Sequence, residues 1–375
     1  MKLFKSLLVA PATIGLLAPV SMFAGEASLN DISKYSNLEH LDLANAFVSD
    51  EPTHNSLLAG GEGLVDSDSY DGGFSETTTA SFSVDAVIGS IDGDTTTEAT
   101  TFEYQYNIGL STSFTGEDSL DVAIDSGSDG ATTGDNPMAF DTGAALSVDG
   151  VTYSFPVGGV SMIVGADTDI SASFTGACSY SSFTDYMGNC GTGNSLGVGG
   201  SGITATGSYA FDSGFSLAAG LSSTADSSVG ILTTEGTDTY GIEAAYTADS
   251  YGLAVAYVST DNAADAETTT WGINGTYSFD LASVSVGYET TETSGTDADG
   301  YFIGLTFPEV GPGSVSIGAG TTGNFADGVT ETMMYEASYS YPVNDGLSIT
   351  PGVYIKEVDG GDDLTGILVK SSFSF

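Results

Sequence analysis

Carboxylates are the side chains through which this sequence could do chemistry. Asp and Glu account for 50 of the 375 residues and Lys and Arg for only 5, so the formal net charge is −45. Arg is absent, and the positive residues are Lys2, Lys5, Lys34, Lys356 and Lys370. So few positive side chains cannot neutralise a nucleic-acid backbone or clamp a phosphate group. Carboxylates that line a confined space instead attract and concentrate cations.

Enzymatic use of these carboxylates finds little support in the rest of the sequence. The only histidines are His40 and His54, and no Ser-His-Asp, zinc-protease or phosphate-binding-loop motif is present. Acid pairs such as Asp121 and Asp125 could serve hydrolysis, but in so acidic a chain the pairing carries no information. We therefore expect no enzyme, no catalytic residues and no specific metal site.

Strands are the elements that must position the acids, because from about residue 74 onward the apolar residues recur with a period of two. In segment 102–114 (FEYQYNIGLSTSF), apolar and aromatic side chains fall on one face, and the other face is polar and begins with Glu103. Segments 240–247 and 271–279 alternate in the same way. The pattern fits a soluble sandwich, whose apolar faces meet in a core, or a membrane barrel, whose apolar face contacts lipid.

The spacing of the breaks between strands distinguishes these two folds. Short breaks occur near 114–117, 156–159, 212–214, 248–250, 280–282, 308–313 and 342–346. Longer breaks alternate with them, near 91–100, 127–144, 172–200, 223–238, 260–269, 290–299, 320–331 and 357–363. Strict alternation is typical of outer-membrane barrels, which have short turns on one side and long loops on the other. We predict an all-β transmembrane antiparallel barrel of about sixteen strands over residues 74–375.

Aromatic residues on the apolar face support the barrel. In five segments they lie six positions apart, namely Tyr240/Tyr246, Tyr251/Tyr257, Trp271/Tyr277, Tyr301/Phe307 and Tyr335/Tyr341. Six residues span roughly 20 Å along a strand. This repeated spacing predicts two aromatic belts, one near each membrane surface.

The two ends of the chain carry signals for export and assembly. Lys2 and Lys5 precede an apolar run at 7–20, which predicts a secretion signal over 1–24, with cleavage after Ala24 or Ala27. Residues 25–73 form a periplasmic segment in which 28–48 reads as a short amphipathic helix or, equally, as a frayed tail. The chain ends in ILVKSSFSF. Its Phe373 and Phe375 resemble the C-terminal assembly signal of outer-membrane barrels.

The sequence also resembles one family more specifically. The runs that carry the resemblance are MKLFKSLLVAPATIGLLAPV at the start, SLLAGGEGLVD (56–66), FSETTTASFSVDAVIG (74–89) and the closing LVKSSFSF. They are similar to porins of marine unicellular cyanobacteria, in the group of carbohydrate-selective (OprB-like) and iron-uptake porins. Many of those porins carry an S-layer-homology domain and a coiled coil before the barrel, and residues 25–73 are too few for both.

The resemblance implies a homotrimer and a third outer loop that folds inward to narrow the channel. That loop is 172–200, the longest of the eight, and Asp185 within it is a candidate constriction acid. Cys178 and Cys190 lie 12 positions apart in the same loop. Export permits a disulfide between them, worth on the order of 3 kcal/mol. Two free thiols, or a bond without effect on permeation, are the alternatives.

The polar faces of the strands supply the remaining lining of the predicted channel. The candidate acids are Glu103, Asp121, Asp125, Glu243, Glu289 and Glu336, and the only opposing cations are Lys356 and Lys370. A lumen lined by one sign of charge favours counter-ions. We therefore predict an outer-membrane channel that passes small hydrophilic solutes, such as sugars and inorganic ions, with a preference for cations. The alternative is a secreted, acidic, β-rich surface or adhesion protein.

Acids in the predicted outer loops could bind Ca²⁺ or Mg²⁺ weakly through their oxygens. They cluster in the first, fifth and eighth loops, at Asp92, Asp94, Glu98, Asp261, Asp265, Glu267, Asp359, Asp362 and Asp363. Surface acidity that keeps the protein soluble in salty water is the plainer account of them.

Overall fold

A computed structural model of the chain describes residues 77–93, 99–128, 137–140, 143–198, 202–224, 232–233, 236–262 and 266–375. The predicted signal at 1–24, the segment 25–73 and its helix at 28–48 lie outside these residues. Among the described residues, no helix is long and apolar enough to cross a bilayer.

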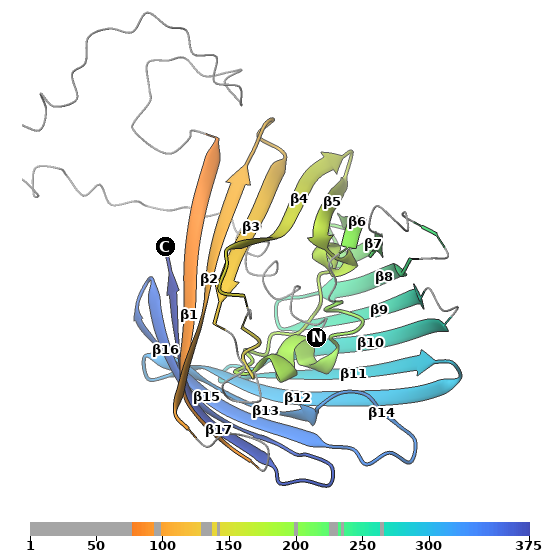
Figure 1. Cartoon of the computed structure of the whole chain (residues 1–375). Coiled ribbons are helices and arrows are strands. Elements are labelled where there is room, and N and C mark those ends of the chain that lie inside the picture. The colour runs from red at the N-terminus through yellow and green to blue at the C-terminus, as the bar shows by residue number, and fades with distance from the viewer. Residues whose placement is uncertain are drawn as a thin grey trace, which may run out of the picture. The chain divides into compact units, whose positions relative to one another are not determined.

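Sixteen long antiparallel strands form one closed sheet (Figure 1). They are β1 (Thr78–Asp92), β2 (Thr101–Thr112), β3 (Ser119–Gly127), β4 (Ser147–Val157), β5 (Val160–Thr168), β6 (Gly202–Ala210), β7 (Phe215–Ser223), β8 (Asp238–Thr247), β9 (Tyr251–Asn262), β10 (Ala266–Ser278), β11 (Ser283–Thr293), β12 (Thr296–Val310), β13 (Gly313–Thr321), β15 (Met333–Asn344), β16 (Leu347–Lys356) and β17 (Leu364–Ser374). The two-residue strand β14 (Phe325–Ala326) pairs with β12 within the connection from β13 to β15. The sixteen-strand barrel predicted from the sequence is confirmed.

The last strand closes the barrel against the first. β17 pairs with β1 from Ser83↔Ser374 to Asp92↔Thr365. Beyond this ladder, Phe375 exchanges two backbone hydrogen bonds with Phe82, at 2.9 and 3.0 Å. Closure leaves no unpaired edge among the sixteen described strands, as a hydrocarbon environment requires.

Side chains alternate between the two faces of the wall as the period of two predicts. On β8, Ile242 is 57% exposed on the outer face, while its neighbour Glu243 is 3% exposed on the inner face. The outer face carries rows of contacting aromatic rings, such as Tyr257 with Trp271 at 4.8 Å and Tyr246 with Phe215 at 4.7 Å. The apolar and aromatic face therefore looks outward, and acids such as Glu243 look inward.

Two of the predicted long loops are short, and this part of the prediction was wrong. β9 and β10 are separated only by residues 263–265, and β11 and β12 only by Ser294 and Gly295. The Thr-rich segments assigned to loops extend the strands instead, because β-branched residues fit a pleated surface. Ser294 and Gly295 both have positive φ angles, 53° and 79°, as a tight hairpin turn of this length requires.

Candidate functional site

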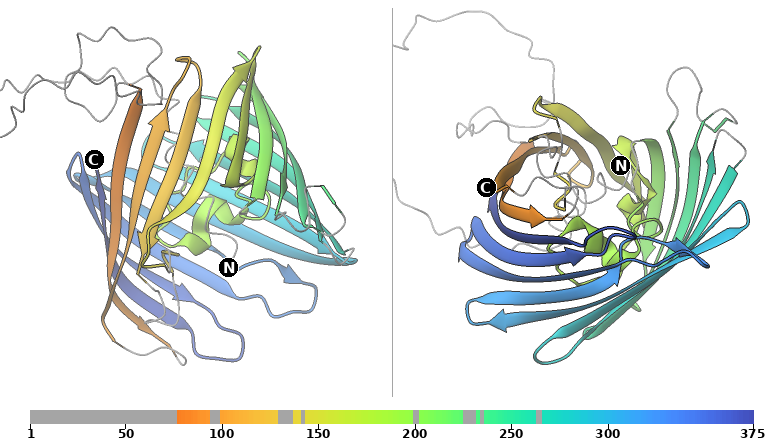
Figure 2. Two further views of the ribbon diagram at one scale, coloured as in Figure 1. Left: turned by 45° about the horizontal axis from the view of Figure 1, so that its top comes forward. Right: turned by 60° about the horizontal axis from the view of Figure 1, so that its bottom comes forward.

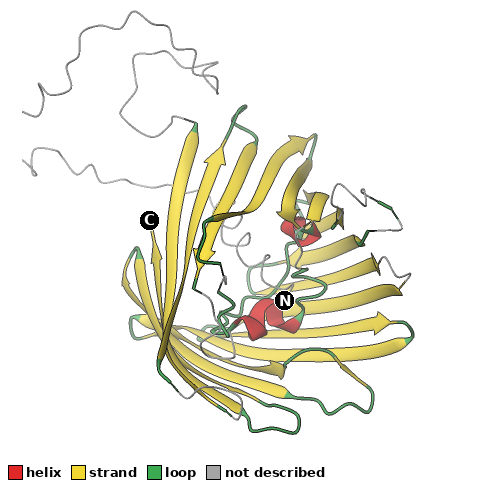
Figure 3. Cartoon of the chain, in the orientation of Figure 1, coloured by secondary structure: helices red, strands yellow, loops and turns green. Residues whose placement is uncertain are grey.

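One long connection lies inside the barrel. It comprises residues 169–201 between β5 and β6, of which 169–198 are described, and we call it the inner loop. Two short 3-10 helices within it, η4 (Ile170–Ser173) and η5 (Asp185–Gly191), are surrounded by strands (Figure 3). At the start of η4, the Asp169 side chain accepts a hydrogen bond from the Ser171 backbone N–H at 2.8 Å. The inward path follows the expectation for loop 172–200.

Polar side chains of the barrel wall hold the inner loop by its backbone. Glu243 on β8 accepts hydrogen bonds from the N–H groups of Thr175 and Gly176, both at 2.7 Å. Asn274 on β10 accepts another from the N–H of Ala177 at 2.8 Å. These wall groups satisfy loop donors that have no strand to pair with.

Glu336 on β15 accepts four hydrogen bonds from the same loop. Its Oε1 accepts from the Tyr180 hydroxyl at 2.9 Å and from the Phe183 N–H at 2.8 Å. Its Oε2 accepts from the N–H and the hydroxyl of Thr184, at 2.9 and 2.6 Å. Both carboxylate oxygens are therefore fully used by the loop.

Glu289 on β11 holds the end of the loop that follows η5. It accepts from the Asn194 side chain at 2.6 Å and from the Ser195 hydroxyl at 2.7 Å. Asn324, in the connection from β13 to β15, donates to the same carboxylate at 3.0 Å. We call Glu243, Glu289 and Glu336 the anchor glutamates.

The anchor glutamates face inward as predicted, but they do not line open space. Their exposed fractions are 3% for Glu243, 0% for Glu289 and 3% for Glu336, because the inner loop covers them. The interpretation of these three as free lumen charges is therefore corrected. A buried carboxylate is stable only when its oxygens are hydrogen-bonded, and the loop backbone supplies those bonds here.

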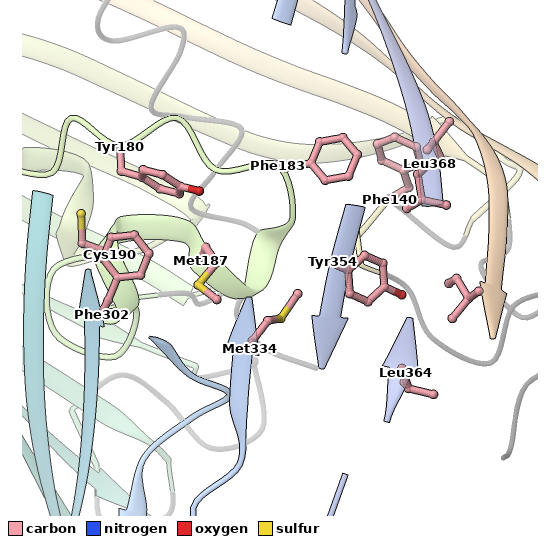
Figure 4. Close-up of a cluster of buried hydrophobic side chains, with 12 residues drawn as sticks. Phe140, Tyr180, Phe183, Met187, Cys190, Phe302, Met334, Tyr354, Leu364 and Leu368 are labelled. Atoms are coloured by element: carbon pink, nitrogen blue, oxygen red, sulfur yellow. The ribbon is translucent and has the colours of Figure 1, made fainter. Parts of the chain in front are cut away.

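Apolar packing holds the other side of the inner loop against the wall (Figure 4). Tyr180 packs against Phe302 of β12 in a tilted arrangement, with ring centroids 4.9 Å apart and an interplanar angle of 57°. Wall glycines give the rings room, because a Cβ at Gly352 would lie 2.5 Å from the Phe183 ring and one at Gly318 would lie 2.6 Å from the Tyr180 hydroxyl. The buried cluster comprises Val87, Ile91, Phe140, Tyr180, Phe183, Met187, Cys190, Phe302, Met334, Tyr354, Leu364 and Leu368.

A disulfide joins Cys178 and Cys190 within the inner loop, with their Cα atoms 5.8 Å apart. Cys190 is fully buried and has a positive φ of 54°, as does Asn189 beside it at 51°. The bond links Cys178, which follows the residues that donate to Glu243, to the end of η5. Its effect on permeation stays a prediction.

Part of a second loop, residues 137–140 between β3 and β4, also lies inside the barrel. The sequence did not predict this. The Pro137 carbonyl, between β3 and β4, accepts a hydrogen bond from the Asp185 N–H at 2.8 Å. Phe140 of the same loop lies in the buried cluster with Leu368 of β17. The only sequence signal was a pair of apolar residues, Met138 and Phe140, in an otherwise polar stretch.

The other predicted lining residues divide by burial. Glu103 on β2 and Asp125 on β3 are buried, so these two are also not free lumen charges. Asp121 and Lys370 are half-buried on the inner face. Lys356, also half-buried, donates from Nζ to the Tyr186 hydroxyl at 2.8 Å and lies 4.1 Å above that ring, a favourable cation–π position.

Comparison with known proteins decides the family. A family described as Gram-negative porin matches residues 77–361. The chain belongs to the Gram-negative porin family. No curated protein matches the sequence itself.

Solved structures share the fold of this porin at low identity. OprB of Pseudomonas putida has a TM-score of 0.63 at 12% identity, over 80% of this chain and 94% of that one. A loop-deletion mutant of Vibrio cholerae OmpT has a TM-score of 0.58 at 11% identity, over 80% and 100%. A triple mutant of the Rh. blastica porin has a TM-score of 0.50 at 17% identity, over 79% and 100%.

Family membership makes this porin an outer-membrane channel for passive diffusion. It argues against the alternative of a secreted surface or adhesion protein. Seen in two further orientations, the inner loop lies within the ring of strands through which solutes pass (Figure 2). The candidate functional site is therefore the inner loop together with the wall groups that hold it inside the barrel.

The charge of Asp185 in the inner loop should depend on pH. Burial raises the pKa of its carboxyl to about 6, so the group is neutral below that pH and negative above it. We expect cation preference to rise with pH between about 5 and 7. Reversal potentials across a KCl gradient measure this, and Asp185→Asn should flatten the rise. Asp362→Asn, in the exposed loop after β16, is the matched control. An identical pH profile for Asp185→Asn and wild type would refute the contribution of Asp185 to cation preference.

Proposed function

We propose that this porin passes small hydrophilic solutes and inorganic ions, including sugars, with a preference for cations. The observation that carries the proposal is the imbalance of charge inside the barrel, on the wall and the inner loop taken together. Lys356 and Lys370 are the only positive side chains in the described part of the chain. Asp85 and Asp121 on the wall and Asp185 in the inner loop are half-buried acids.

Three contacts support this assignment of the charges. Lys356 lies against Tyr186, so one of the two cations is held by the inner loop. Asp85 and Asp121 accept hydrogen bonds from the hydroxyls of Ser372 and Ser119, which hold the two carboxylates on the inner wall. A wall with excess negative charge concentrates cations along the diffusion path.

A planar-bilayer recording under a KCl gradient tests the proposal. We expect stepwise openings with a reversal potential of the sign for K⁺, moving toward zero in Asp121→Asn. The preference should fade in concentrated salt, because the Debye length falls from about 10 Å at 0.1 M to about 3 Å at 1 M. Anion preference in the wild type would refute the assignment of the acids while leaving the channel in place.

The assembly state belongs to the same proposal. The resemblance to cyanobacterial porins supports a homotrimer embedded in outer-membrane lipid. Native mass spectrometry of the detergent-solubilised protein distinguishes a trimer from a monomer.

A further inference from the structure

Four polar residues form a row on the outer face of the barrel, away from the channel. Ser223 ends β7 and pairs with Asp238 on β8, Asp238 pairs with Asp261 on β9, and Asp261 pairs with Glu267 on β10. Asp238 lies four residues from the outward-facing Ile242 on an unbroken strand, so the row faces outward too. We call these four residues the rim row.

The rim row is electrostatically unfavourable without a bound cation. Side chains directly opposite each other on neighbouring strands lie about 4.5–5.5 Å apart at Cβ, and like charges there are destabilising. Asp238 is 6% exposed and its Oδ1 has no hydrogen-bond partner; Ser223 is 1% exposed and its Oγ has none. Lys356 and Lys370, the only cations among the described residues, lie on β16 and β17. No side chain in the described part of the chain therefore neutralises the row, and a bound cation would do so.

An apolar groove lies next to the rim row on the same strands. It has a volume of about 480 Å³ and is lined mainly by Leu217, Ile242, Val255, Tyr257 and Trp271. Ile242, Tyr257 and Trp271 each precede or follow a rim residue by four positions, about 13 Å along a strand. The groove faces the hydrocarbon layer, and the row lies beyond it toward the long-loop end of the barrel.

We propose that the groove and the rim row together bind an anionic, phosphate-bearing lipid through a divalent cation. An acyl chain lies in the groove beside Trp271 and Tyr257, and the cation joins the lipid phosphate to Asp238 and Asp261. Mg²⁺ and Ca²⁺ take oxygen ligands of these kinds, and Trp and Tyr favour the level where chain meets headgroup.

The chemistry of the rim row explains why the divalent cation and the lipid phosphate are both needed. The described residues bring no three His, Cys, Asp or Glu side chains into one metal cage. Phosphate and water oxygens must therefore complete the coordination shell, so the cation binds weakly without the lipid. The lipid phosphate, in turn, is repelled by the three acids unless the cation lies between them. This inference concerns the outer face and does not depend on the cation preference of the channel.

Mn²⁺ serves as the probe for the cation, with the full-length protein in nanodiscs. Electron paramagnetic resonance counts bound Mn²⁺ in nanodiscs of phosphatidylcholine alone and of phosphatidylcholine with phosphatidic acid, corrected by empty nanodiscs. We expect tight binding only with phosphatidic acid, weakened by roughly tenfold in Asp238→Asn because one charged ligand is lost. Asp362→Asn, which removes an acid outside the row, should bind like the wild type. Glu267→Gln, at an exposed position, gives a second reading if Asp238→Asn does not fold.

Native mass spectrometry distinguishes the lipid from the metal alone. Phosphatidic acid should stay on the wild-type protein and leave after EDTA treatment. Val255→Trp fills the groove and should lose the lipid while the acids remain. Equal Mn²⁺ binding by wild type and both row variants, or lipid that stays after EDTA, would overturn the proposal.

Discussion

Replacing Glu336 with Gln should loosen the inner loop and raise the conductance of the open channel. An amide nitrogen cannot accept a hydrogen bond, so whichever oxygen it replaces, it faces two loop donors. The hydroxyls of Tyr180 and Thr184 can rotate to accept from it, but the N–H of either Phe183 or Thr184 is left unpaired. A buried unpaired donor costs about 1–3 kcal/mol, which corresponds to roughly 5- to 150-fold more of the detached loop.

Single-channel recording and hydrogen exchange test this prediction together. Glu336→Gln should show larger or noisier open steps and faster exchange of the Phe183 and Thr184 amides. Glu309→Gln removes a carboxylate from an exposed position near the end of β12 and is the matched control. Unchanged conductance and unchanged exchange in Glu336→Gln would mean that the other anchor glutamates and the apolar cluster hold the loop without Glu336.

Removal of the disulfide should have the second-largest effect. The bond closes a loop with a sequence separation of 12, and cross-links of this size are worth on the order of 3 kcal/mol in the chain-entropy model. We expect the Cys178→Ala/Cys190→Ala variant to keep the barrel but to exchange the amides of η5 faster. Its open-channel current should fluctuate more, since Asn189 and Cys190 hold positive φ angles that the bond helps to maintain.

Reduction gives an internal control for the cysteine variant. Dithiothreitol should reproduce the added current noise in the wild type and leave the double variant unchanged. If the reduced wild type and the double variant both record like the oxidised protein, the bond orders the loop without affecting permeation.

Much of the barrel could be predicted because each strand obeys a local rule. Phe102 and Glu103 must point to opposite faces, whatever the rest of the chain does, because adjacent residues of a strand always do. The two loops predicted too long lie where the composition is polar. The Thr-rich stretches 260–269 and 290–299 resemble loops in polarity, but Thr is a favourable strand residue and both hairpins continue there.

The candidate site was less predictable because its partners are far apart in the sequence. Glu336 and Thr184 are separated by 152 positions and Glu243 and Gly176 by 67, so no local pattern links them. The sequence did hold one indirect clue. Inward acids that have no Arg or Lys to pair with must find other donors, and loop backbone N–H groups are the remaining supply.

The sequence by itself determined the barrel, its strand number, the direction of the side chains in the strands it identified and the excess of negative charge. These follow from the period of two and from composition, which depend on neighbouring residues only. The tertiary structure alone decided which acids are covered, because burial depends on where residues 169–198 fold after the barrel has closed. It also decided that Ser223, Asp238, Asp261 and Glu267 stand side by side. Strand register sets that alignment, and register is a property of paired strands rather than of any one of them.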